Sequence, residues 1–127
     1  KLRYNLKKHK EELPMPFINV KTNREVSDEK VNIIKTELGK AITAIPGKSE
    51  MWLMVCVEGD KKLFFRGENV PAAMVEVSVY GNASQSALSD LTARITGILT
   101  ENLSLSPDYV YVSYTMMDTW GWNGSNL

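Results

Sequence analysis

The 127-residue chain is poor in the side chains that bind metals or form disulfides. It contains one cysteine, Cys56, and one histidine, His9, and neither has a partner at the spacing of a zinc site. The sequence also argues against a histidine-dependent triad, because His9 lies outside the patterned part of the chain. We therefore predict no metal, no cofactor and no internal disulfide.

Long hydrophobic runs and net charge are also absent. No apolar segment approaches the length of a membrane span, and the first residues lack the apolar centre of a signal peptide. The formal net charge is zero, although residues 1–15 carry five basic and two acidic side chains. A mildly acidic body has no electrostatic footprint for nucleic acid. We expect a protein that binds neither membrane nor nucleic acid and that is cytoplasmic, or exported without a signal peptide.

The most informative feature that is present is an internal repeat with an offset of 57 residues. An amphipathic helix is predicted over residues 27–45, with Ser27 as its N-cap and acidic residues in its first turn. Its apolar positions are Val31, Ile34, Leu38, Ala41, Ile42 and Ile45. Five of these six, and the capping serine, recur 57 residues later as Ser84, Leu88, Leu91, Ile95, Ile98 and Leu99.

Strand-like segments flank each predicted helix at the same offset. Residues 18–20 correspond to 75–77, and "WLMVC" at 52–56 corresponds to "YVYVS" at 109–113. The turn "EGDKK" at 58–62 is predicted to lead through "LFF" into a short extra strand. Two such units side by side predict an α+β two-layer sandwich, with a four-stranded mixed sheet and two helices on one face. The strands carry large apolar residues on both sides, so we expect further copies of the chain to cover the bare face.

Four motifs carry a resemblance to a known family. They are "PFINVKTN" from Pro16, "PGK" at 46–48, "SPDYVYVSY" at 106–114 and "GWNGSNL" at 121–127. Together they are similar to the family of macrophage migration inhibitory factor and D-dopachrome tautomerase, within the tautomerase superfamily. The resemblance runs from Pro16 to the C-terminus. It implies a homotrimer whose sheets enclose a central channel, and a keto–enol tautomerase acting on a 2-oxo acid such as phenylpyruvate.

The resemblance also implies that Pro16 is the catalytic base, which requires a free amino terminus. A proline nitrogen within a chain is an amide whose lone pair is delocalised, whereas a terminal proline is a secondary amine. We therefore interpret residues 1–15 as an upstream leader and 16–127 as the single mature domain, with Met15 as the natural initiator. "KEE" at 10–12 can be encoded as a bacterial ribosome-binding sequence, which favours a bacterial member and a misplaced start. A genuine basic leader, or a remnant of the expressed sequence, is the alternative. Little activity is expected while residues 1–15 remain attached.

The remaining site residues are assigned by the resemblance, and each also has a plain structural interpretation. Lys48 would bind the substrate carboxylate, or else be a solvated charge near a helix end. Tyr80 would offer its backbone N–H. Tyr111 and Ser113 would reach the site of a neighbouring subunit, although Tyr111 could simply fill the sheet. Trp122 would line the pocket mouth or anchor the C-terminal segment against a neighbouring subunit. The second hypothesis is a non-catalytic signalling protein whose trimer engages a receptor.

Overall fold

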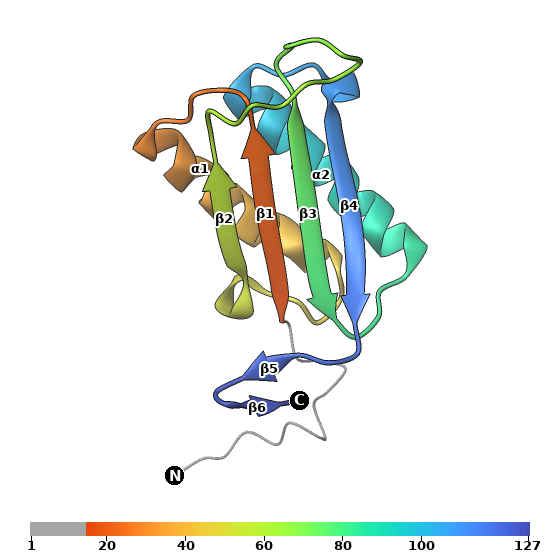
Figure 1. Cartoon of the computed structure of the whole chain (residues 1–127). Helices are drawn as coiled ribbons and strands as arrows, with labels where there is room; N and C mark the ends of the chain where they lie inside the picture. Colours follow the sequence, from red (N-terminus) through yellow and green to blue (C-terminus); the bar gives the residue numbers. More distant parts are fainter. Residues whose placement is uncertain (1–14) are drawn as a thin grey trace.

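The structure is a computed structural model, and it describes residues 15–127. Two strand–helix–strand units follow each other along the chain (Figure 1). The first comprises β1 (Pro16–Thr22), α1 (Asp28–Ala41) and β2 (Met54–Glu58), and the second comprises β3 (Ala73–Tyr80), α2 (Gln85–Leu103) and β4 (Val110–Met117). The sheet order is β2-β1-β3-β4, with parallel outer pairs and an antiparallel central pair. The predicted α+β architecture is confirmed.

The internal repeat is confirmed, and it extends to the hydrogen bond that caps the N-terminus of each helix. The Ser27 side chain accepts a hydrogen bond from the Lys30 N–H, and the Ser84 side chain accepts one from the Ala87 N–H. Each bond satisfies one of the backbone donors that a helix leaves unpaired in its first turn. The two helices begin 57 residues apart, at Asp28 and Gln85, as the offset requires.

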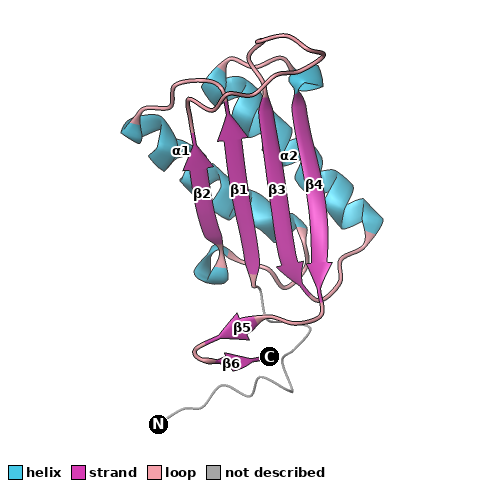
Figure 2. Ribbon diagram, viewed as in Figure 1, coloured by secondary structure: helices cyan, strands magenta, loops and turns pink. Residues whose placement is uncertain are grey.

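Both helices lie on the same face of the sheet (Figure 2). Alternate strand residues point towards them and are buried, as a sheet with one covered face requires. The main core joins these residues to the apolar sides of both helices, and its largest fully buried aliphatic members are Ile18, Ile34, Leu38, Ile42, Ile45, Leu91, Ile95 and Leu99.

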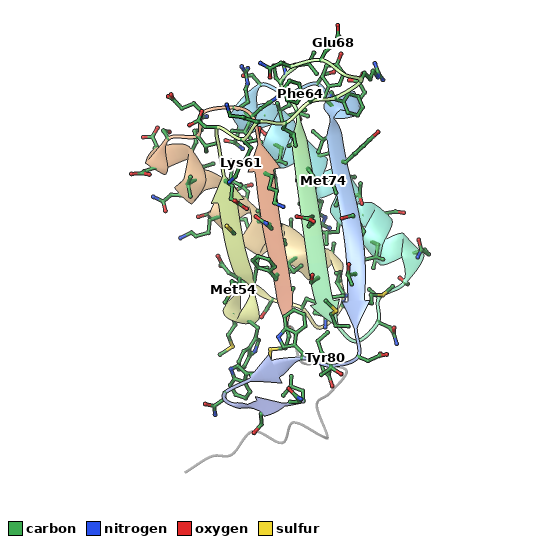
Figure 3. All side chains as sticks on the ribbon, in the orientation of Figure 1. Met54, Lys61, Phe64, Glu68, Met74 and Tyr80 are labelled. Carbon is green, nitrogen blue, oxygen red and sulfur yellow. The ribbon has the colours of Figure 1, made fainter. Side chains whose placement is uncertain are left out.

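The other face of the sheet is open in the protomer, and it is less apolar than we expected. Met54, on edge strand β2, is 68% exposed, and Met74 also lies on this face (Figure 3). The centre of the face is polar, because Lys21 forms a 3.0 Å ion pair with Glu76 from the neighbouring strand. Trp52 and Tyr109, which we included in the predicted strands, instead belong to short 3₁₀ helices that precede the strands.

Two strand starts and one helix end that we predicted from the sequence were wrong. The strand predicted from Trp52 begins at Met54, and the strand predicted from Tyr109 begins at Val110. The helix predicted to reach Ile45 is α-helical only to Ala41 and continues as a 3₁₀ turn to Ala44. No extra strand follows residues 58–62 in the described structure, where Phe65 and Glu68 form only an isolated bridge.

The chain ends in a small β-hairpin, which lies below the start of β1 (Figure 1). Its strands are β5 (Gly121–Trp122) and β6 (Ser125–Asn126), joined by Asn123 and Gly124 with φ of 53° and 81°. Two consecutive positive φ values are typical of the tight turn that Asn-Gly favours. Among residues 15–127, no helix has the length and apolar character needed to cross a membrane. The same residues contain no cluster of three His, Cys, Asp or Glu side chains suited to a metal ion.

Candidate active site

Pro16 is the first residue of β1 and is buried. It pairs with Val79 near the end of β3, so the sheet register fixes its position. Its nitrogen is part of the peptide bond to Met15. Because that nitrogen is an amide, it has no proton-accepting lone pair in the chain as it stands.

Tyr80 connects the peptide before Pro16 to Lys48. The Tyr80 N–H donates a 3.2 Å hydrogen bond to the Met15 carbonyl oxygen, and the Tyr80 carbonyl accepts a 3.1 Å bond from Lys48 Nζ. Tyr80 is fully buried and lies at the end of β3 above the C-terminal hairpin (Figure 3). The structure thus brings together three of the predicted site residues, Pro16, Tyr80 and Lys48.

Lys48 is held by a tight turn that the sequence "PGK" specifies. The Lys48 N–H donates to the Ile45 carbonyl at 3.0 Å, and Gly47 between them has a φ of 83°. Proline followed by a residue of positive φ is the pattern of a type II turn. Lys48 is only 6% exposed, so the interpretation of this residue as a solvated surface charge was wrong. Burial lowers the pKa of its ammonium group below the usual lysine value, because desolvation disfavours the charged form.

An aromatic cluster forms the apolar wall next to Pro16. We use this name for Trp52, Tyr80, Trp120, Trp122 and Leu127, which pack together around the Met15 side chain. The rings of Trp52 and Trp122 meet edge to face, with centroids 5.1 Å apart and an interplanar angle of 87°. A pocket of about 370 Å³ opens here and is lined by Met15, Pro16, Phe17, Met51, Trp52, Leu53, Met54, Trp120, Gly121 and Trp122.

The C-terminal hairpin positions the outer part of this cluster. The Leu127 N–H donates a 2.9 Å hydrogen bond to the Trp120 carbonyl, which closes the hairpin end beside the pocket. The tight turn at Asn123 and Gly124 reverses the chain immediately after Trp122. Trp122 therefore lines the pocket and packs against Trp52 of the same protomer, while its contact with a neighbouring subunit stays a prediction.

Tyr111 and Ser113 are not near Pro16 in the same protomer. Tyr111 pairs with Met74, whereas Pro16 pairs with Val79, which is five residues further along the same strand. At the rise of an extended strand this separation is about 16 Å. Tyr111 is 58% exposed on the edge strand, and its ring packs edge to face against Phe65 at 5.2 Å.

Sequence reasoning missed several members of the site. Met15 was treated only as a residue to be removed, yet its side chain is 3% exposed within the aromatic cluster. Neither Leu127 nor Trp120 was assigned a role in the site. The dipeptide Asn123-Gly124 was the available signal, because Asn-Gly between strand-forming residues favours a tight hairpin.

Comparison with known proteins identifies the family of the chain. The sequence profile of the family described as "Macrophage migration inhibitory factor (MIF)" matches residues 15–127. The chain belongs to the macrophage migration inhibitory factor family. Mouse macrophage migration inhibitory factor is a relative with 29% identity over 115 residues, which are 89% of this chain and 99% of the mouse protein.

Solved structures of family members share the fold. The crystal structure of Leishmania major MIF2 has a TM-score of 0.84 and 27% identity, and the match covers 89% of this chain and 97% of that one. The macrophage migration inhibitory factor homologue from Prochlorococcus marinus has a TM-score of 0.78 and 23% identity, with 87% and 97% of the two chains covered. At that identity, the second likeness supports the fold alone. Family membership is therefore supported by sequence and by structure.

Proposed function

We propose that this chain, once Pro16 is freed at the amino terminus, is a cofactor-independent keto–enol tautomerase of 2-oxo acids such as phenylpyruvate. The observation that carries the proposal is that the Tyr80 backbone links the Met15–Pro16 peptide to Lys48, next to an apolar pocket that Pro16 lines. This grouping combines a base, a cation and an N–H donor beside an uncharged cavity.

The proposed chemistry is a proton transfer with no net redox change. The Pro16 amine takes a proton from C3 of the 2-oxo acid, the C–H electron pair forms the C2–C3 double bond, and the carbonyl π pair moves to oxygen, which receives the proton back from the Pro16 ammonium. The reverse step regenerates the keto acid and the free amine. An ordinary α-amino group titrates near roughly pH 8, and burial beside a cation lowers that pKa towards the working pH of a general base.

The other residues of the site have binding roles in this proposal. The Lys48 ammonium binds the substrate carboxylate through a charge-assisted hydrogen bond. The Tyr80 N–H, released from the Met15 carbonyl when Met15 is removed, binds a substrate oxygen. We further propose that the protein is a homotrimer, in which Tyr111 and Ser113 of a neighbouring subunit complete each site. Two unpaired sheet edges, at β2 and β4, and one open sheet face are available for this assembly.

Because Met15 acylates the Pro16 nitrogen, the chain that retains residues 1–15 favours the alternative of a non-catalytic binding protein. While Met15 remains attached, Pro16 has no basic lone pair and the Tyr80 N–H is already bonded. In that form the protein would be a non-catalytic binding protein of the same family, whose trimer engages a receptor.

The test compares two chains, one beginning at Lys1 and one at Pro16, with each amino terminus verified by mass spectrometry. We expect phenylpyruvate tautomerisation only in the chain that begins at Pro16. A Pro16→Gly variant of that chain should lose about 10²-fold or more, the usual contribution of a positioned general base. Equal activity in both chains, or activity insensitive to Pro16→Gly, would overturn the proposed mechanism.

A further inference from the structure

The Met15 acyl group occupies the site in the manner of a bound ligand. Its carbonyl oxygen accepts a hydrogen bond from the Tyr80 N–H at 3.2 Å, and its carbonyl carbon is bonded to the Pro16 nitrogen. Its side chain extends into the aromatic cluster and is only 3% exposed. Met15 thus occupies three parts of the site at once: it is hydrogen-bonded to the Tyr80 N–H, it is bonded to the Pro16 nitrogen, and its side chain packs in the aromatic cluster.

The Met15 side chain shows what this wall accommodates. It is unbranched, has three rotatable bonds and ends in a polarizable thioether, a group that packs favourably against aromatic rings. Trp52, Trp120 and Trp122 supply such rings, and Leu127 adds an aliphatic surface. A flexible chain of this length is buried here among rings and aliphatic groups of residues 15–127.

The absence of charged residues around the pocket also restricts which substrate side chains it can bind. None of the ten residues that line it is charged. Lys48, the buried cation, donates to the Tyr80 carbonyl and is not among the residues that line the pocket. A carboxylate at the end of a substrate side chain would therefore lose its hydration among tryptophan rings without an opposite charge, which is costly.

We propose that the mature enzyme acts on 2-oxo acids with an unbranched, uncharged side chain of methionine length, which takes the place that Met15 occupies in this chain. This inference rests on the proposed tautomerase function and names its substrate class. A representative substrate is 4-methylthio-2-oxobutanoate, whose carboxylate would bind Lys48. Its C3 proton would pass to the Pro16 nitrogen and return, with no oxidant or second substrate required.

The experiment uses the chain that begins at Pro16 and follows exchange of the C3 protons in D₂O by NMR. The substrate series keeps the chain length constant: 4-methylthio-2-oxobutanoate, 2-oxohexanoate and 2-oxoglutarate, with phenylpyruvate as a reference for the basic activity. We expect kcat/KM for the thioether and alkyl acids to exceed that for 2-oxoglutarate by at least about tenfold. Trp122→Ala should reduce this preference mainly through KM, while Ile33→Ala, on the exposed side of α1, should leave it unchanged.

A binding measurement separates this inference from the proposed function. All three tryptophans of the chain belong to the aromatic cluster, so their fluorescence reports directly on its occupancy. The reduced analogue 2-hydroxy-4-methylthiobutanoate should change the fluorescence saturably in the chain beginning at Pro16 and leave it unchanged in the chain beginning at Lys1. Phenylpyruvate turnover without the thioether preference overturns this inference and leaves the tautomerase intact. Specific binding of the analogue without turnover of any acid supports the subsite and removes the enzymatic proposal.

Discussion

The backbone of Tyr80 is hydrogen-bonded on one side to the Met15 carbonyl, at 3.2 Å, and on the other to Lys48 Nζ, at 3.1 Å. The residue that would acylate the base and the cation that would bind substrate are therefore held by the two backbone polar groups of one residue. Removal of Met15 would free both the Pro16 amine and the Tyr80 N–H. One cleavage would thus create the base and an oxygen-binding donor together.

Lys48 provides a prediction on substrate binding. In the chain that begins at Pro16, Lys48→Met should raise the KM for phenylpyruvate about 10- to 100-fold, the cost of losing a charged hydrogen bond. The turnover number should change less, because the base is untouched. The control is Lys40→Met, at an exposed position in the last turn of α1, which should leave KM unchanged. A fall in kcat with an unaltered KM would contradict the carboxylate-binding role.

The same lysine predicts a pH dependence of stability. Its pKa in the folded chain lies below the unfolded value of 10.5, because burial disfavours the ammonium. Between these two values the unfolded chain binds more protons than the folded chain, so the free energy of unfolding contributed by Lys48 rises with pH. Urea unfolding across the alkaline range should show this contribution in the parent chain and not in Lys48→Met.

Tyr114 predicts the opposite trend in the same range. Its hydroxyl lies 2.8 Å from Thr92 Oγ1 and donates to the Leu88 carbonyl at 3.1 Å, which joins β4 to α2. Burial raises its pKa above 10.0, so its stabilising effect is complete below that pH and is lost as the pH rises through the folded value. Tyr114→Phe should cost about 1 kcal/mol at neutral pH and should lack this alkaline loss. Tyr109→Phe, in the 3₁₀ helix just before β4, is the matched control. If it lowered the free energy of unfolding as much as Tyr114→Phe does, the stabilising role of the Tyr114 hydroxyl would be contradicted.

The two N-caps give a test of the repeat itself. Ser27→Ala and Ser84→Ala each remove a side-chain acceptor for a first-turn N–H, so each should lower the free energy of unfolding by about 1 kcal/mol. Ser89→Ala, at an exposed position within α2, should stay within about 0.5 kcal/mol of the parent. Equal effects at all three serines would mean that the caps are not what stabilises the helix starts.

The repeat was predictable because its signals are local. Helical spacing of apolar residues and a serine before each helix can be seen in any short window, and the sheet face follows from alternation. Strand starts at Trp52 and Tyr109 were predicted wrongly because aromatic residues favour strands only when a neighbouring strand is available. Here each ring instead lies in a 3₁₀ turn, where Trp52 packs on Trp122 from the far end of the chain.

The apolar part of the site could not be read from the sequence for a related reason. Met15 packs with Leu127 and Trp122, from the C-terminal hairpin, although more than 100 residues separate them in the sequence. Lys48 is similar, because its burial depends on the carbonyl of Tyr80, 32 residues away. The resemblance named Pro16, Lys48 and Tyr80, but the contacts that link them are long-range.

Subunit mixing tests whether Tyr111 acts across an interface. Within one protomer Tyr111 and Pro16 lie at opposite ends of the sheet, whereas Lys48 and Pro16 lie at the same end. Equal amounts of Pro16→Gly and Tyr111→Ala chains, both without residues 1–15, should be refolded together and assayed. If each site takes Pro16 from one subunit and Tyr111 from the next, about one quarter of the sites in random trimers are complete.

The matched control mixes Pro16→Gly with Lys48→Met chains in the same way. Since both residues belong to one protomer's site, no mixed trimer contains a site with both groups intact, and no recovery is expected. Recovery to about one quarter in the first mixture alone would establish the shared site, because random assembly fixes that fraction. Equal recovery in both mixtures, or none in the first while the chains sediment as trimers, would place Tyr111 outside the catalytic pocket.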